Sequence, residues 1–91
     1  MTFNMYAIHD KLAGTFSNPF ALDERTAMRT FNFMVKERAE IDCADREIVK
    51  VGEWNNETGE LMDMYDHYGM TYDVVFDMEK TKKDQMEREG K

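Results

Sequence analysis

One segment of the chain repeats its apolar residues at the spacing of an α-helix, between Glu24 and about Arg38. Polar and charged residues fill the positions between them, which is typical of an amphipathic helix with one buried face. Asp23 comes directly before this segment and suits the N-cap, where its carboxylate can accept a backbone hydrogen bond. The expected buried face consists of Ala27, Met28, Phe31, Met34 and Val35.

Two stretches before this helix have the pattern of strands. Residues 3–10 alternate large side chains with small or polar ones, which suits a half-buried strand. A loop-like segment follows, and then residues 15–22 contain further β-forming side chains. Pro19 cannot donate to a strand ladder, so it confines this second stretch to an edge or to an irregular extended run. Together the two stretches predict a first hairpin.

A second hairpin is predicted after the helix and a polar connector over residues 40–45. Residues 49–54 and 60–64 are strand-like, and the loop between them is rich in turn-forming residues. The side chains of Asn55 and Asn56 can start a type I turn, and Gly59 can adopt the positive φ that leads into the second strand. The order β-β-α-β-β predicts an α+β fold, a small antiparallel sheet of two hairpins with one amphipathic helix packed on it.

The C-terminal part of the sequence is less regular. Residues 65–70 are predicted to form a loop, and residues 71–78 contain enough apolar side chains for a short strand or turn, with helix and strand both open. From residue 77 to residue 91, ten of fifteen residues are charged, so this part has little to bury. We therefore expect one domain over residues 1–76 and a charged tail over residues 77–91, either helical or disordered.

Composition narrows the class of protein. A chain of 91 residues has room for one domain, and Cys43, its one cysteine, cannot form an internal disulfide, which favours a reducing compartment. The chain has no apolar run long enough to span a membrane and no signal-peptide pattern, so a cytoplasmic protein is expected.

The net charge is −7, and residues 51–91 hold five Lys or Arg against eleven Asp or Glu. A general affinity for nucleic acid would need the cations gathered on one face.

One such gathering lies on the predicted helix, opposite its apolar face. Arg25, Arg29, Asn32 and Lys36 follow one another at spacings of three or four residues, and Phe33 lies beside them. Cations next to an aromatic side chain form a candidate surface for phosphates and bases. The alternative is the ordinary solvated face of an amphipathic helix.

An aromatic set provides a second candidate for stacking bases. It contains Trp54, at the end of a hairpin strand, and the nearby tyrosines 65, 68 and 72. Closure of a small hydrophobic core is the alternative role for such a tryptophan.

The sequence contains no catalytic motif. It lacks a phosphate-binding glycine loop, a dinucleotide-binding fingerprint, paired CxxC motifs and a nucleophile elbow. His9, Asp10 and Cys43 have no spacing typical of metal ligands, and His9 is expected to point off an edge strand. We interpret Asp63, Asp66 and His67 as polar residues of a loop rather than as a catalytic or metal site. We therefore expect a protein that is not an enzyme and that uses no metal or cofactor.

The residues that identify a family lie between about residues 3 and 62. They are Met5-Tyr6-Ala7-Ile8-His9-Asp10-Lys11 with Ala13 and Phe16, Pro19-Phe20, Ala27, Arg29 and Phe31, and Gly52-Glu53-Trp54-Asn55 leading to Thr58-Gly59. In order and rough spacing this chain resembles the small nonstructural protein family of gokushoviruses, which are single-stranded-DNA bacteriophages of the Microviridae.

The resemblance implies an accessory protein of the host bacterial cytoplasm that binds DNA or acts in viral single-stranded genome synthesis and packaging. One hypothesis is direct binding of single-stranded DNA, with cations on phosphates and an aromatic side chain on a base. The other is a protein interaction module, a homodimer or an adaptor to a replication, capsid or host protein, that does not bind DNA. The candidate DNA contacts are Lys11, Arg25, Arg29, Phe33, Lys36 and Trp54.

Overall fold

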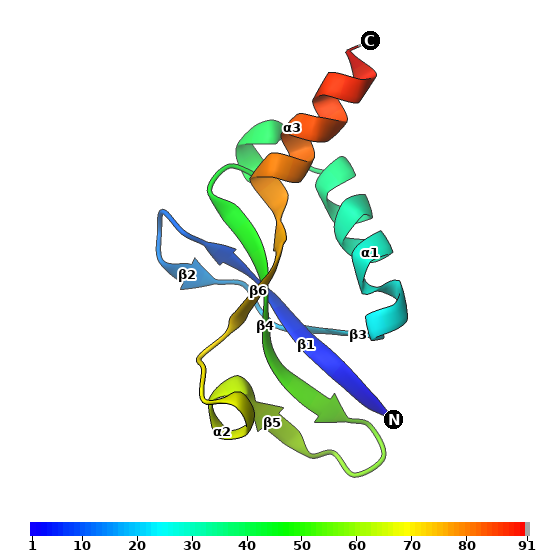
Figure 1. Cartoon of the computed structure of the whole chain (residues 1–91), viewed down its shortest axis with the longest axis vertical. Coiled ribbons are helices and arrows are strands. Elements are labelled where there is room, and N and C mark those ends of the chain that lie inside the picture. The colour runs from blue at the N-terminus through cyan, green and yellow to red at the C-terminus, as the bar shows by residue number, and fades with distance from the viewer. Residues whose placement is uncertain (91) are drawn as a thin grey trace.

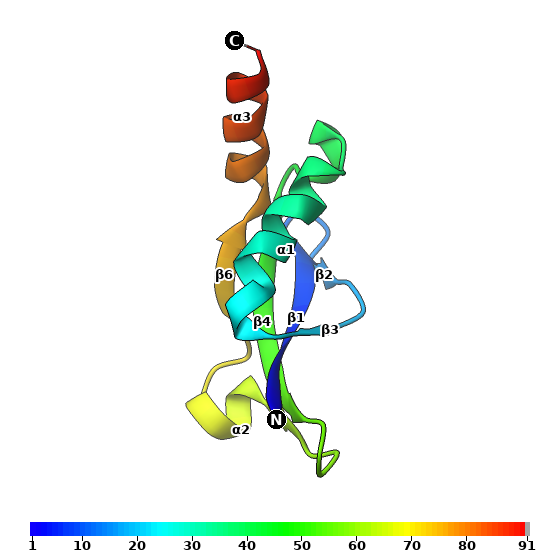
Figure 2. The same cartoon turned by 90° about the vertical axis from the view of Figure 1, so that its right-hand side faces the viewer.

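The computed structural model describes residues 1–90, except for the side chains of residues 66 and 67. The molecule is elongated, with extents of 48 × 27 × 18 Å, and a curled antiparallel sheet runs along its length (Figure 1). Helix α1 lies along one face of that sheet (Figure 2). The elements in chain order are β1 (Thr2–Asp10), β2 (Thr15–Phe16), β3 (Phe20–Leu22), α1 (Glu24–Lys36), the 3-10 turn η1 (Glu40–Asp42), β4 (Arg46–Asn55), β5 (Leu61–Asp63), α2 (Met64–Tyr68), β6 (Asp73–Asp77) and α3 (Met78–Glu89). The α+β class and the antiparallel sheet are confirmed.

Strands β1 and β4 form the centre of the sheet. They pair from Thr2 opposite Asn55 to Asp10 opposite Arg46, with a shift in register between Met5 and Tyr6. β2 and β3 pair with different parts of β1, and β5 and β6 pair with different parts of β4. Pro19 falls between β2 and β3, so the first hairpin has the interrupted edge that its proline predicts.

The second hairpin is confirmed, and its loop has the chemistry expected from its sequence. Asn55 Oδ1 accepts hydrogen bonds from the backbone N–H groups of Glu57 and Thr58, at 2.9 and 3.3 Å. Gly59 has a φ of +76° and donates its N–H to the Asn55 carbonyl. This positive φ explains why a glycine precedes the second strand.

Helix α1 is also confirmed, with Asp23 as its N-cap. Ala27, Phe31 and Val35 are buried against the sheet, four residues apart. The inclusion of Met28 in the buried face is wrong, because its side chain is 56% exposed. Met28 points in nearly the same direction around the helix as Val35 but lies about two turns earlier, so this side of α1 is covered only towards its C-terminal end.

The hydrophobic core lies between α1, the sheet and the start of α3. The Phe31 ring packs against Tyr6 and Phe76, with centroid distances of 4.9 and 5.4 Å. Both aromatic partners come from strands, so one helix side chain joins β1 and β6. The other buried members of this cluster are Ala27, Val35, Cys43, Ile48 and Met78.

The C-terminal part is more ordered than the sequence indicates. The loop predicted over residues 65–70 is wrong at its start, because Met64–Tyr68 is a one-turn helix that leads into Gly69, where φ is +72°. Residues 73–77 form a strand on β4. Of the charged segment over residues 77–91, Met78–Glu89 forms helix α3, which is the helical alternative, and residue 91 lies outside the described residues. Met78, the first residue of α3, has no exposed surface.

Candidate nucleic-acid interface

The N-terminal turn of α1 holds the first predicted cation, Arg25, against the helix cap. The Asp23 carboxylate accepts the Arg25 backbone N–H at 2.9 Å and also pairs with the Arg25 guanidinium at 2.9 Å. The side-chain hydrogen bond between them lowers the pKa of Asp23 and raises that of Arg25. The charge of Arg25 is therefore partly neutralised by Asp23.

The remaining residues of the predicted stripe share the outer face of α1. Arg29, Asn32, Phe33 and Lys36 are all exposed, and the Phe33 side chain keeps 60% of its surface in water. Within residues 1–90, neither the Arg29 nor the Lys36 side chain makes an ion pair or hydrogen bond. Asn32 donates its side-chain amide to the Met28 carbonyl of the preceding turn. We call Arg29, Asn32, Phe33 and Lys36 the α1 outer face.

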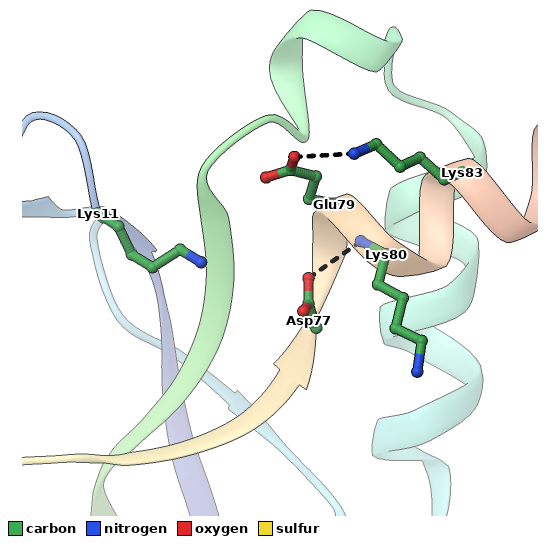
Figure 3. A pocket seen from close by; sticks show the side chains of 5 residues that line it. All are labelled: Lys11, Asp77, Glu79, Lys80 and Lys83. Carbon is green, nitrogen blue, oxygen red and sulfur yellow. Dashed lines mark hydrogen bonds and ion pairs between the residues drawn. The ribbon is translucent and has the colours of Figure 1, made fainter.

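Lys11 lies elsewhere, in the loop between β1 and β2. It lines a hollow of about 260 Å³ together with Asp77, Glu79, Lys80 and Lys83 at the start of α3. Figure 3 shows Lys11 reaching from its loop toward this end of α3. Lys80 and Lys83 were not predicted as site residues, since the charged segment they belong to carries both signs and gives no indication of which side chains face Lys11.

The two carboxylates of this hollow are already engaged. Asp77 caps α3 by accepting the Lys80 backbone N–H at 3.0 Å, and Glu79 accepts the Asp45 backbone N–H at 2.9 Å. Glu79 also pairs with Lys83 Nζ at 3.2 Å (Figure 3). The hydrogen bond from Asp45, followed by the contact with Lys83, lowers the pKa of Glu79. The hollow therefore holds a small excess of positive charge.

Trp54 is separated from the α1 outer face by the sheet. Tyr6 packs on Phe31 of α1, so Phe3, three positions earlier in β1, points to the opposite face. Trp54 is paired with Phe3 and contacts its ring, with a centroid distance of 6.1 Å. Leu61 of β5 is paired with Trp54 on the other side. We call Phe3, Trp54 and Leu61 the tryptophan row.

The predicted tyrosine platform is divided among several places. Tyr72 packs against His9 and Phe16, with centroid distances of 5.3 and 5.4 Å. Tyr68 instead lies under Lys50 Nζ and donates its hydroxyl to Glu53. The structure therefore does not bring Tyr68 and Tyr72 together with Trp54 as one stacking surface.

The side chains of His9 and Cys43, which could in principle act as metal ligands or reactive groups, are engaged in contacts within the fold. His9 lies on the interior strand β1, so the prediction that it points off an edge strand is wrong. Its Nδ1 pairs with the Glu47 carboxylate at 2.8 Å, and its ring stacks on Phe16. Cys43 is in the core, where burial raises the pKa of its thiol. Among the described residues, no three His, Cys, Asp or Glu side chains are grouped to hold a metal ion.

None of the helices in residues 1–90 combines the length and apolar character needed to cross a membrane.

No curated protein and no solved structure matches the chain. A family of phage proteins does match, over residues 3–68, from β1 to the end of α2. This match does not distinguish one group of phages from another, so the gokushovirus origin stays a prediction. The match covers well over half of the sequence, and the chain therefore belongs to the Phage ORF5 protein family.

Proposed function

We propose that this phage protein is a non-enzymatic accessory protein that binds single-stranded DNA through the α1 outer face during viral genome synthesis or packaging. The observation that carries the proposal is the arrangement of Arg29, Phe33 and Lys36. All three are exposed on one face of the helix, and neither cation is neutralised within the described chain. An unneutralised cation can bind a phosphate, and an exposed ring can stack a base.

The distribution of charge supports binding at α1 rather than at the hairpin that bears Trp54. The helix carries three Lys or Arg and one Glu, whereas residues 51–79 carry eight Asp or Glu and no Lys or Arg. Phosphates would be repelled from the hairpin that bears Trp54 and attracted to the helix. Because Arg25 is held by Asp23 and Trp54 lies across the sheet, Arg29, Phe33 and Lys36 are the principal contacts.

A titration with a fluorescent thymidine oligonucleotide tests the proposal. At about 50 mM salt we expect saturable binding that weakens with added salt, with a log–log slope near −1.4 for about two phosphate contacts. Lys36→Glu should weaken binding by about tenfold. The matched control is Arg88→Glu, which changes the net charge equally but lies in the last turn of α3.

Two outcomes would remove the proposal. One is the absence of saturable binding at about 50 mM salt, which would leave a protein interaction role without DNA contact. The other is an equal loss of affinity in Lys36→Glu and Arg88→Glu, which would show that only the overall charge matters.

A further inference from the structure

The loop of the β4–β5 hairpin carries more carboxylates than cations. The hairpin loop carries Glu57 and Glu60, and it projects beside the N-terminus at the bottom of Figure 1. Glu57 binds the N-terminal ammonium of Met1 at 2.9 Å. The carboxylate of Glu60 has no ion-pair partner in the part of the chain that the structure describes. With no Lys or Arg between residues 51 and 79, this end attracts cations.

Apolar side chains are exposed at the same end. Leu61 keeps 67% of its surface in water and Trp54 keeps 37%. They lie next to each other in the tryptophan row, which crosses three adjacent strands on the face opposite α1. A contiguous apolar row of this kind beside a carboxylate is a candidate binding surface.

A small apolar hollow adjoins the tryptophan row and shares Leu61 with it. Its volume is about 110 Å³, which leaves room for the aliphatic part of one side chain. The close approach of β5 to β4 beside it requires glycine at position 52, where an added Cβ would lie 2.5 Å from the Met62 carbonyl oxygen. The residues that line the hollow are Met5, Pro19, Val51, Gly52, Leu61, Met62 and Asp63.

We propose that the tryptophan row and this hollow bind a basic segment of a partner protein. The aliphatic stem of a Lys or Arg fits the hollow, and its charged head can lie over the Trp54 ring or toward Glu60, which has no ion-pair partner among the described residues. DNA does not fit the charge of this surface. A second copy of the chain is the other candidate occupant, because its α1 outer face offers two unneutralised cations, and the light-scattering result below decides between the two.

The sequence itself supplies the probe for this surface, because Trp54 is the one tryptophan of the chain. A short synthetic peptide of alternating arginine and leucine should bind saturably and shift the Trp54 emission to shorter wavelength, since it removes water from the ring. A peptide of alternating glutamate and leucine should leave the emission unchanged. The titration contains no DNA, so its result does not depend on the function proposed for α1.

Two variants and a matched control locate the site. Leu61→Ser should weaken the peptide by about fivefold, and the pair Glu57→Gln and Glu60→Gln by about threefold. The control pair, Glu87→Gln and Glu89→Gln, removes the same charge from the end of α3 and should stay within about twofold of the unmodified protein. The glutamate variants are exposed loop positions, so they decide the question even if Leu61→Ser folds poorly.

Three results would overturn the proposal. The first is the absence of a saturable emission change with the basic peptide. The second is equal weakening by the hairpin and α3 glutamate pairs, which would indicate attraction by net charge alone. The third is light scattering that shows a dimer of the unmodified protein that Leu61→Ser dissociates, because the row would then be covered by a second copy.

Discussion

Helices α1 and α3 lie side by side, yet different interactions hold them in place (Figures 1 and 2). α1 is fixed by apolar side chains along its whole length, from Ala27 to Val35. α3 buries Met78 at its first position and then extends beyond the sheet. It is joined to α1 by two hydrogen bonds, from Lys82 Nζ to the Val35 carbonyl and from Gln85 Nε2 to the Asn32 carbonyl.

The difference shows how two helices of similar length can depend on different forces. Burial of apolar side chains stabilises α1 on the sheet and does not depend on the segment that leads into the helix. A mostly polar helix of twelve residues is marginal in water, so α3 depends on its cap, on Met78 and on the strand that leads into it. Disruption of the core should therefore affect the whole molecule, whereas changes in α3 should act more locally.

The largest effect is expected for Phe31→Ala. Phe31 is 1% exposed and contacts both Tyr6 and Phe76, so its removal leaves a cavity between the helix and two strands. The free energy of unfolding should fall by about 3–5 kcal/mol, measured by urea denaturation. A loss below about 1 kcal/mol would mean that α1 is not held by this side chain.

Met78→Ala should come next, with a loss of about 2–5 kcal/mol. Its side chain is fully buried at the junction of β6 and α3, so α3 loses its one apolar anchor to the core. Hydrogen exchange should show greater loss of protection in α3 than in α1. Met86→Ala is the control on the same helix, because Met86 is 40% exposed and its removal should cost less than about 0.5 kcal/mol.

The same contrast explains how far the sequence predicts the fold. Helix α1 and both hairpins follow from local patterns, namely apolar spacing, the Asp23 cap, and the Asn55 and Gly59 turn. α3 does not, because its placement depends on long-range contacts such as the Glu79 bond to the Asp45 backbone, 34 positions apart. Met78 is a single apolar residue and has no periodic partner that could reveal its burial.

The candidate site is predictable to a similar extent. The α1 outer face follows from helical periodicity, so its exposed cations and Phe33 are where the sequence predicts them. The position of Trp54 across the sheet depends on register with Phe3, which spacing along the chain does not give. The grouping of Lys11 with Lys80 also requires the folded chain, since a loop and a helix about seventy positions apart meet there.

A smaller effect is expected at the cap of α3. Asp77→Ala removes the carboxylate that accepts the Lys80 N–H and should lower the free energy of unfolding by about 1 kcal/mol. Asp77→Asn should retain most of the stability, because an amide oxygen can accept the same hydrogen bond. Equal losses in the two variants would show that the charge at the helix start matters more than the cap.

The pH dependence of stability gives a finer test of the α3 contacts. The pKa of Glu79 is lowered in the folded protein, so its contribution is present above the unfolded value of about 4.3 and is lost as pH falls through the folded pKa. Glu79→Gln should therefore be less stable than the unmodified protein at neutral pH and equal to it in acid. A difference that persists unchanged at low pH would contradict this role for the Glu79 charge.

The smallest effect on stability is expected for Phe33→Ala, two positions from Phe31 on the same helix. Phe33 is 60% exposed, so its removal should change the free energy of unfolding by less than about 0.5 kcal/mol. Affinity for the thymidine oligonucleotide should nevertheless fall by about fivefold, because the stacking partner of a base is lost. Leu12→Ala, at an 84% exposed loop position, should alter neither quantity. If Phe33→Ala lowers stability and leaves oligonucleotide binding intact, the ring serves the fold, and the α1 outer face binds phosphates without stacking.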